Sequence, residues 1–207
     1  MRIATLFPEC VVTVEATDEM WHAALFAAEE IAIRNARPKR RREFAAGRAC
    51  ARVALARLGV PQAVLPVGLD RLPLWPAGIL GSISHCDTTC AVAVARRDDL
   101  AGLGLDVERA DPLDEGTVSM VCAEEELEDA RRRSGLHRGV AAKLLFSAKE
   151  AVYKCCYPLL RERWDFDEVR IQLESPDAFV ATPRGRSALH GRYVVDSDRI
   201  LTTVTIR

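Results

Sequence analysis

Residues 102–108 read Gly102-Leu103-Gly104-Leu105-Asp106-Val107-Glu108, a pattern that is informative about the fold. Its apolar residues predict a buried β-strand, and successive side chains on a strand point to opposite faces. Asp106 and Glu108 therefore share one face, while Val107 points to the other. Two carboxylates on one face suit Mg²⁺, which prefers oxygen ligands and takes its other ligands from water and phosphate. The simpler alternative is a strand whose polar end reaches solvent, and for two acids alone that alternative is favoured.

A predicted helix over residues 140–157, VAAKLLFSAKEAVYKCCY, changes this balance; we expect it to end at Pro158. Glu150 lies in its middle among apolar residues, and Lys154 follows one turn later on the same face. Alone, the two would be a surface ion pair worth about 0.2–0.5 kcal/mol. Together with the two acids of the strand they supply a third carboxylate and a cation. A phosphoryl-transfer site needs a metal, charge neutralisation and a base, so these residues indicate that chemistry.

A second polar set is Gly81-Ser82-Ile83-Ser84-His85. On a strand the two serines face the same way, and His85 stands at the strand end before a turn. A hydroxyl and an imidazole suit phosphate oxygens, and a glycine permits close approach of the backbone. A serine-rich hairpin with a structural histidine is the alternative. A Ser-His nucleophile is disfavoured, because adjacent strand residues point apart and no G-x-S-x-G turn is present.

A basic cluster opens the helix predicted over residues 39–58, where four cations run from Lys39 to Arg42. Arg48 follows two turns after Arg41, so both fall on roughly the same face. The cluster fits an anionic small ligand, although a solvated face is equally compatible with it. Nucleic-acid binding is disfavoured, since interleaved aromatic residues are missing and the net charge of the chain is −1.

The order of predicted elements indicates an α+β protein built from two similar halves. We expect a helix over 18–32, and a Pro-rich connection over 61–78. The remaining segments alternate between strand and helix patterns, with predicted strands at 9–15, 79–86, 90–96, 100–108, 168–173, 178–182, 191–195 and 200–206 and a further helix at 123–133. Long helices and hairpins recur about 100 residues apart, so we expect an antiparallel sheet packed by a long helix in each half. The predicted halves are residues 1–100 and 101–207.

Composition restricts the function classes. The chain has 207 residues, 49% of them hydrophobic, with 29 Lys and Arg against 30 Asp and Glu, so overall charge predicts no partner. The N-terminal segment lacks the arrangement of a signal peptide, and no window approaches the roughly 20 apolar residues of a membrane span. Seven cysteines show no C-x-x-C spacing, and no second pair supports a zinc site. We interpret them as reduced thiols and expect a cytoplasmic protein.

Four segments occur here in the order and approximate spacing of a known family: RRREFAAGR at 40–48, PLWPAGILGSISHC at 73–86, GLGLDVE at 102–108 and FSAKEAVYK at 146–154. They resemble the phosphopantetheinyl transferases, in particular the long, pseudo-dimeric type and its enterobactin-synthetase-component subgroup. The resemblance spans roughly residues 37–157. The family's metal motif is commonly G-[IV]-D-[IV]-E, so Leu105 is a mild departure that leaves both acids intact.

The resemblance implies a 4'-phosphopantetheinyl transferase fold and activity. Such an enzyme moves 4'-phosphopantetheine from coenzyme A to a serine of an acyl, peptidyl or aryl carrier protein and releases 3',5'-ADP. It would serve siderophore, nonribosomal-peptide or polyketide synthesis and use Mg²⁺, with Mn²⁺ as a possible substitute. A monomer would suffice, because the two linked halves can supply the whole site. Segment 111–139 is a candidate surface for docking the carrier.

The resemblance also implies roles for individual residues. Asp106, Glu108 and Glu150 would bind the metal, and Glu150 would accept the proton of the carrier serine. Lys154 would hold the diphosphate. Coenzyme A would be bound further by Ser84, His85, Arg48, Arg40 or Arg41, Arg71 and the Pro73–Gly78 segment with Pro76. Two other functions remain open: a non-catalytic coenzyme A-binding module, and a different Mg²⁺-dependent phosphotransferase or nuclease.

Overall fold

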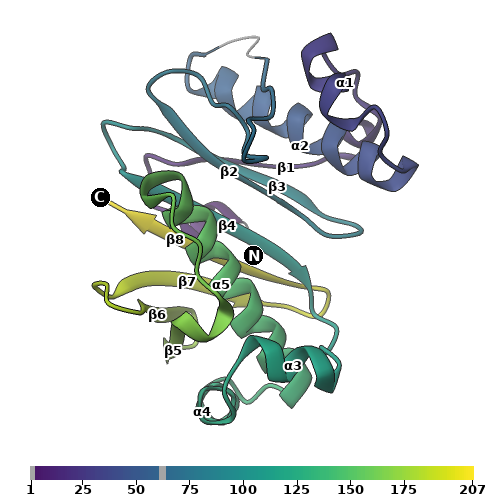
Figure 1. Cartoon of the computed structure of the whole chain (residues 1–207). Coiled ribbons are helices and arrows are strands. Elements are labelled where there is room, and N and C mark those ends of the chain that lie inside the picture. Colours follow the sequence, from purple (N-terminus) through teal and green to yellow (C-terminus); the bar gives the residue numbers. More distant parts are fainter. Residues whose placement is uncertain (1–2, 61–63) are drawn as a thin grey trace.

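The computed structural model describes residues 3–60 and 64–207, and Figure 1 shows two parts, one above the other. The upper part contains α1 (Ala27–Ile33), α2 (Pro38–Arg57) and a sheet of β1 (Val12–Glu15), β2 (Ile79–His85) and β3 (Cys90–Arg96). Its strand order is β1-β3-β2, with antiparallel pairing throughout. The helix α2 covers this sheet, with the buried side chains of Ala51, Ala54 and Leu55 in the core between them.

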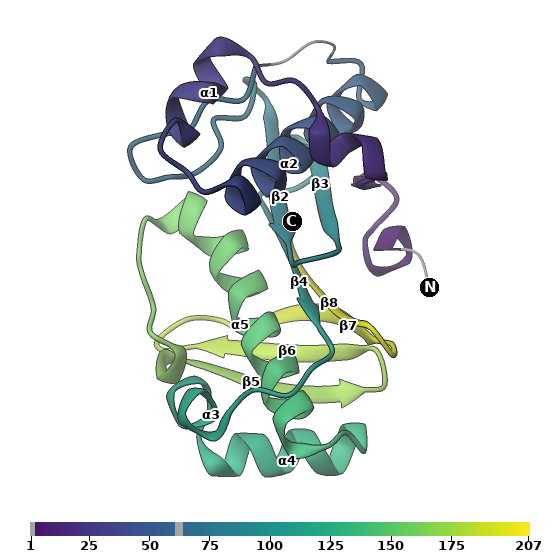
Figure 2. The same ribbon diagram turned by 90° about the vertical axis from the view of Figure 1, so that its right-hand side faces the viewer.

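The lower part repeats this plan with more strands. It contains β4 (Gly102–Arg109), α3 (Glu115–Val121), α4 (Glu124–Ser134), α5 (Arg138–Leu160), β5 (Val169–Ser175), β6 (Ala178–Pro183), β7 (Leu189–Val195) and β8 (Arg199–Ile206). The sheet order is β4-β8-β7-β6-β5, all antiparallel. Figure 2 shows α5 crossing the face of this sheet, with α4 beyond its lower end. The predicted α+β class, with a long helix on an antiparallel sheet in each half, is confirmed; the two sheets differ in size.

Local sequence explains the ends of the first long helix. Pro38 occupies the first helical position of α2, where its missing N–H costs no hydrogen bond. Gly59 follows the helix with a φ of 78°, a conformation that glycine adopts without a side-chain clash. The predicted helix over 39–58 therefore agrees with α2. The Pro-rich connection that follows begins at residues 61–63, which lie outside the described residues.

The predicted continuous helix over 18–32 is wrong. The chain forms a short 3-10 helix at Asp18–His22, runs extended through Phe26, and then starts α1. Tertiary contacts of Glu29 explain the break: its carboxylate accepts hydrogen bonds from the Phe26 backbone N–H at 3.0 Å and from the Leu65 N–H at 3.0 Å. Arg52 neutralises the same buried carboxylate at 3.0 Å. These contacts outweigh the helical periodicity.

The expected end of the second long helix at Pro158 is also wrong, because α5 continues to Leu160 and ends at Arg161, whose φ is 58°. Pro158 removes one backbone donor without stopping the helix. The helix α3 and the 3-10 helices at Ile3–Leu6 and Phe166–Glu168 were not predicted. The strands β2, β3 and β5 to β8 lie where the pattern placed them, within a few residues at each end.

The two parts are joined by side chains of β2 lying beside β4. Ser82 Oγ accepts from the Leu105 N–H at 3.0 Å, and Ser84 Oγ accepts from the Val107 N–H at 3.1 Å. Because the residue numbers on both strands increase together, β2 and β4 run parallel at this contact. Two serine hydroxyls thus replace the backbone bonds of a continuous sheet. The predicted common direction of the two serines is therefore confirmed, and it points toward β4.

A shared apolar core holds the junction together. It combines residues of the upper part, including Leu80 and Ala93, with Leu103, Leu105 and Leu201 of the lower part. The buried Leu6 belongs to it as well, and its carbonyl oxygen accepts a hydrogen bond from Thr203 at 3.1 Å. The seven cysteines are free. Within the described ranges, none of the helices has the length and apolarity needed to cross a membrane.

Candidate active site

Asp106 is the centre of the candidate site. It lies on β4, and only 2% of its surface is exposed. Its Oδ1 accepts hydrogen bonds from Ser84 Oγ at 2.9 Å and from Lys154 Nζ at 2.6 Å, and its Oδ2 accepts one from Ser147 Oγ at 2.8 Å. These donors come from β2 in the upper part and from α5 in the lower part. Asp106 thus joins the two parts at one carboxylate.

The number of available protons determines which groups donate and which accept in the hydrogen bonds around Lys154. Ser84 Oγ accepts from the Val107 N–H and from Lys154 Nζ at 2.9 Å, so its single proton goes to Asp106. An ammonium group has three N–H bonds, and Lys154 uses two of them for Ser84 and Asp106. Within the described structure, the third N–H remains for an anion in the adjoining cavity, which Lys154 lines.

Glu108 lies two residues further along β4, next to Asp106. Burial, followed by the charge of Asp106, raises the pKa of the Glu108 carboxyl to about 7. Lys143 on α5 opposes this shift, with Nζ 3.8 Å from Glu108 Oε2 and 3.2 Å from Asp111 Oδ1. Asp106 and Glu108, which were predicted to share one face of the strand, therefore repel each other when both are charged. This repulsion favours a cation beside the two carboxylates.

Glu150 approaches from α5. It lines the cavity together with Lys154, one helical turn away. Burial raises the pKa of the Glu150 carboxyl, and Asp106 adds to this effect while Lys154 opposes it. The charge of Asp106 thus acts on both Glu108 and Glu150.

The acids do not form a closed ligand set. Among residues 3–60 and 64–207, no three Asp, Glu, His or Cys side chains are grouped in a way that could hold a metal ion. Lys154 holds Asp106 Oδ1 instead. The donor chemistry nevertheless fits Mg²⁺, since Asp106, Glu108 and Glu150 offer carboxylate oxygens and a divalent cation would relieve their repulsion. Binding of such an ion requires these side chains to rearrange.

The closeness of α5 to β4 comes from Gly104. A Cβ atom built on Gly104 would overlap the carbonyl oxygen of Ala151 and lie 2.8 Å from the Cys155 backbone nitrogen. The helix backbone therefore rests directly on the strand, which brings Lys154 within reach of Asp106. A larger residue would separate the helix from the strand.

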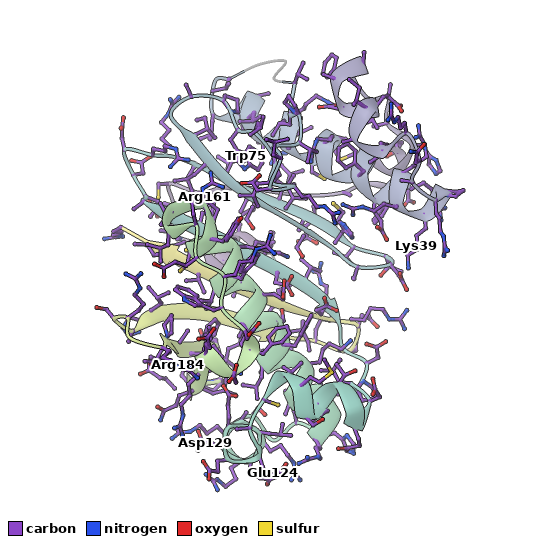
Figure 3. The ribbon with its side chains drawn as sticks, in the orientation of Figure 1. Lys39, Trp75, Glu124, Asp129, Arg161 and Arg184 are labelled. Carbon is purple, nitrogen blue, oxygen red and sulfur yellow. The ribbon has the colours of Figure 1, made fainter. Side chains whose placement is uncertain are left out.

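A cavity of about 730 Å³ opens beside these groups, between the two parts. Its upper wall includes Arg40, Arg48, Arg71, Trp75 and His85, and its lower wall includes Glu150, Tyr153, Lys154 and Arg161. Figure 3 shows Trp75 near the β2 end of the upper part and Arg161 near the top of α5, on the same side of the molecule. Lys39 lies away from them, at the far end of α2. The cavity thus carries cations on both walls.

Arg48 is the most deeply buried of these cations, with 4% of its surface exposed. Its Nε donates to the Leu65 carbonyl oxygen at 2.8 Å, and its guanidinium lies 4.1 Å from the centre of the Phe44 ring. Burial lowers the pKa of the Arg48 guanidinium to about 10. In the described part of the chain no carboxylate forms an ion pair with Arg48. Its buried positive charge lies at the cavity wall, where an anionic ligand could neutralise it.

His85 lies at the end of β2 in contact with α2. Arg40 can only donate, so His85 Nε2 accepts from Arg40 Nη1 at 2.5 Å and the ring proton belongs on Nδ1. Nδ1 faces Glu43 Oε2 at 3.7 Å. Burial, with Arg40 adding to its effect, lowers the pKa of the His85 imidazole, while Glu43 opposes this change. His85 is therefore a neutral, oriented hydrogen-bonding group at the cavity wall.

Arg71 lies in a loop that closes on itself through a bridge between Val67 and Pro73. Its φ is 67°, an unusual conformation for a residue with a side chain. The neighbouring Asp70 forms an ion pair with Arg161 at the end of α5. The loop is therefore attached to the opposite part of the molecule, next to the cavity.

The structure separates the predicted coenzyme A-binding residues into two groups. Arg40, Arg48, Arg71, His85 and Lys154 line the cavity. Arg41 does not line it and contacts Glu30 at 2.7 Å and the Ile33 carbonyl oxygen at 2.9 Å. Pro76 lies beside the lining residue Trp75, and Ser84 is buried behind the wall, where its hydroxyl contacts the protein groups described above.

Several contributing residues were not predicted. Ser147 lies within the quoted FSAKE segment, but a serine in a helix gives no signal of its own. Glu43, which faces His85, lies three residues after Arg40, so an i,i+3 pattern could have indicated it. Lys143 and Tyr153 approach the site only through the tertiary fold, whereas Trp75 lies within the predicted Pro73–Gly78 segment.

The fold is a two-part α+β arrangement, and the cavity between its parts is lined by cations that suit an anionic ligand. A family model described as the 4'-phosphopantetheinyl transferase N-terminal domain matches residues 28–95, and one for the 4'-phosphopantetheinyl transferase superfamily matches residues 102–204. The chain belongs to this family, whose members transfer 4'-phosphopantetheine to carrier proteins.

Individual relatives agree with this assignment. The chain is 38% identical over 223 residues to the 4'-phosphopantetheinyl transferase Svp of Streptomyces mobaraensis, covering 99% of this chain and 89% of that protein. It is 36% identical over 194 residues to the transferase Npt of Nocardia iowensis, covering 93% and 85%. Identity to the Enterobactin synthase component D of Salmonella typhi is 35% over 147 residues, covering 70% and 60%.

Proposed function

We propose that the cavity between α2 and α5 binds coenzyme A and that Asp106, Glu108 and Glu150 hold Mg²⁺ beside its diphosphate. The Lys154–Asp106–Ser84 cluster carries this proposal, because it places a cation with a remaining N–H between buried acids and a cavity lined by arginines. Coenzyme A carries a diphosphate and a 3'-phosphate, and it therefore matches cations contributed by both walls.

Each wall supports one part of the substrate. Lys154 would donate its third N–H to the diphosphate, and the oriented His85 would bind a neighbouring phosphate oxygen. Arg48, with Arg40, would bind the 3'-phosphate, because a buried guanidinium gains most from a doubly charged partner. Arg71 and the loop around it would border the adenine. Ser84 would act behind the wall by holding Lys154 and Asp106 together.

The transfer step follows from this placement. The hydroxyl oxygen of the carrier serine attacks the β-phosphorus, a new P–O bond forms, and the P–O bond to the leaving 3',5'-ADP breaks with its electron pair. Glu150, on the cavity wall, takes the serine proton, since a neutral hydroxyl is a poor nucleophile. Lys154 stabilises the charge that develops on the leaving phosphate. Mg²⁺, when bound, would polarise the diphosphate and neutralise charge there.

The biological setting is proposed on less direct grounds. We expect a cytoplasmic monomer, supported by seven free thiols and by a site that one chain completes. The carrier would be an acyl, peptidyl or aryl carrier protein of siderophore, nonribosomal-peptide or polyketide synthesis. The relative named Enterobactin synthase component D supports a siderophore context. We divide the chain at residues 1–100 and 101–207, supported by family models that match 28–95 and 102–204.

An intact-mass assay tests the proposal. Apo carrier protein incubated with the enzyme, coenzyme A and Mg²⁺ should gain about 340 Da, the phosphopantetheine increment. Asp106→Asn and Glu150→Gln should abolish the gain, while Glu174→Gln, an exposed glutamate on β5, should leave it unchanged. Near-normal transfer by either site variant would contradict the assignment of the acids. Equal rates with 3'-dephospho-coenzyme A would contradict the role of Arg48.

A further inference from the structure

Ser147 is a buried hydroxyl that the proposed mechanism does not use. It lies on α5, one turn before Ala151, and none of its surface is exposed. Its Oγ lies 2.8 Å from Asp106 Oδ2 and 2.9 Å from Thr202 Oγ1 of β8. Thr202 is equally buried, and its Oγ1 lies 2.8 Å from the Ser147 carbonyl oxygen. The three residues form a chain of contacts from β8 through α5 to β4.

The direction of these hydrogen bonds follows from the protons available. A carboxylate can only accept, so the contact with Asp106 uses the Ser147 proton, and Thr202 Oγ1 donates to the Ser147 carbonyl oxygen. Either hydroxyl can donate in the contact between the two side chains, and Thr202 lies against the Ser147 hydroxyl in both cases. This arrangement orients Ser147 toward Asp106 Oδ2.

The two oxygens of Asp106 are held differently. Oδ1 receives Ser84 and Lys154, of which Lys154 lines the cavity and is therefore within reach of a bound phosphate. Oδ2 receives Ser147, whose own partner is Thr202 in the interior of the sheet. A carboxylate offers about four acceptor positions, so the three donors leave about one unused. Lys154 would also face a bound phosphate, whereas Ser84 and Ser147 do not line the cavity and hold the carboxylate from within the protein.

We propose that Ser147, fixed by Thr202, is a positioning residue that holds the Asp106 carboxylate in the orientation needed to bind the divalent metal. This inference rests on the proposed function, because it assumes that Asp106 is a metal ligand. A hydrogen bond to a ligating carboxylate typically changes metal affinity by about 10- to 100-fold when it is lost. Ser147 contacts the proposed metal ligand Asp106 and does not line the cavity proposed for the phosphates.

The chain offers a matched control one residue away on β8. Thr203 is also buried, and its Oγ1 donates to the Leu6 carbonyl oxygen at 3.1 Å on the opposite face of the strand. Thr202→Val and Thr203→Val each remove one buried hydroxyl from the same strand with little change in volume. A purely structural role of Thr202 predicts that the two variants behave alike.

Mn²⁺ binding to the full chain tests the inference. Free Mn²⁺ is measured by electron paramagnetic resonance with the protein saturated with coenzyme A and no carrier present, and coenzyme A alone serves as the blank. Ser147→Ala should raise the Mn²⁺ Kd about tenfold or more, and Thr202→Val about three- to tenfold. Thr202→Ser, which keeps the hydroxyl, should restore wild-type affinity, and Thr203→Val should not change it. The Kd of coenzyme A without metal should remain within about twofold in all four variants.

The outcomes separate this inference from the proposed function. If the wild type binds Mn²⁺ and transfers phosphopantetheine, but Ser147→Ala and Thr202→Val keep wild-type affinity, the positioning role is overturned and the function stands. Equal losses in Thr202→Val and Thr203→Val also overturn it. If Ser147→Ala does not fold, the comparison of Val and Ser at position 202 decides. A wild type that binds no Mn²⁺ with coenzyme A present overturns both the metal site and the positioning role.

Discussion

Two lysines five residues apart on α5 differ in their hydrogen-bond partners. Lys149 lies on the face of the helix that other elements cover, and Lys154 lies on the face beside the cavity. Lys149 donates to Glu126 Oε2 at 2.8 Å, to the Val121 carbonyl oxygen at 2.8 Å and to the Phe166 carbonyl oxygen at 2.9 Å. Its three N–H bonds are therefore all used by the protein. Lys154 uses two of its N–H bonds for Ser84 and Asp106, and it lines the cavity, so the third N–H bond remains for a ligand.

The comparison shows that burial alone does not mark a functional cation. The side chain of Lys149 is 2% exposed and that of Lys154 is 26% exposed, yet the less buried lysine lies at the candidate active site. Lys149 ties α3, α4 and the segment at Phe166 to α5, and Glu126 is itself fixed by the Ile171 N–H at 2.6 Å. Unused hydrogen-bonding capacity beside a cavity is the distinguishing property.

The largest effect is expected from Lys149→Met. This change leaves Glu126 as a buried charge without its cation, which typically costs about 3–5 kcal/mol. Urea denaturation should therefore show a strongly lowered midpoint with an unchanged slope. Lys149→Met combined with Glu126→Gln should recover part of the loss, because the amide oxygen still accepts from Ile171. A stability loss below that of Lys154→Met would contradict the division of α5 into two faces.

Lys154→Met should affect catalysis more than stability. Asp106 keeps the hydroxyl donors Ser84 and Ser147, so we expect a destabilisation of only about 1–2 kcal/mol. Loss of the cation at the leaving phosphate should lower kcat for carrier modification about 10²- to 10³-fold. Single-turnover transfer, measured by carrier mass at saturating coenzyme A, isolates this step. A variant whose unfolding midpoint falls while its rate per folded molecule is unchanged would assign Lys154 to the structural class of Lys149.

The parts of the fold that could be predicted are the helices and strands with a regular buried face, whereas segments fixed by contacts between distant residues could not. Period-2 alternation predicted β2, β4 and the C-terminal strands, and long apolar patterns predicted α2 and α5, because these elements bury regular faces. The helix over 18–32 failed since the pattern does not encode the contacts of Glu29 with Leu65 and Arg52, which lie far along the chain. The helix α3 is short, and its seven residues give a weak periodic signal.

Residue type and spacing predicted those parts of the site that lie on a single strand or a single helix. The acids on β4 and the Glu150–Lys154 pair could be assigned to shared faces, and the resemblance supplied the substrate. The sequence did not show which arginine of the run Arg40–Arg42 lines the cavity. Neighbouring residues of a helix point in different directions, and Arg41 contacts α1 instead. Lys149 and Lys154 are equally basic in the sequence, and only the tertiary contacts of each distinguish their uses.

Gly104→Ala changes the cavity face of α5 without removing a charge. The added methyl group would meet the backbone of α5 at Ala151, and such overpacking costs about 1–3 kcal/mol. Because the helix must shift away from β4, transfer should fall by more than the loss of stability explains. The readouts are the unfolding midpoint and the rate per folded molecule. Gly135→Ala is no suitable control, since its φ is 70°; Gly116→Ala, on the short helix α3, serves instead.

The smallest effect is expected at the end of α5, where Arg161 pairs with Asp70 of the loop that carries Arg71. The side chain of Arg161 is 60% exposed, so solvent and salt screen the pair, and its loss should leave the unfolding midpoint unchanged. Asp70→Asn or Arg161→Gln should raise the Kd of coenzyme A by less than about fivefold, because the loop beside the cavity loses one attachment. Calorimetric titration at low and high salt measures this effect, and high salt should reduce the difference from wild type. Additive losses in the double variant would show that the two residues act separately, and a loss beyond tenfold would place Arg161 with Lys154 as a residue that contacts the substrate.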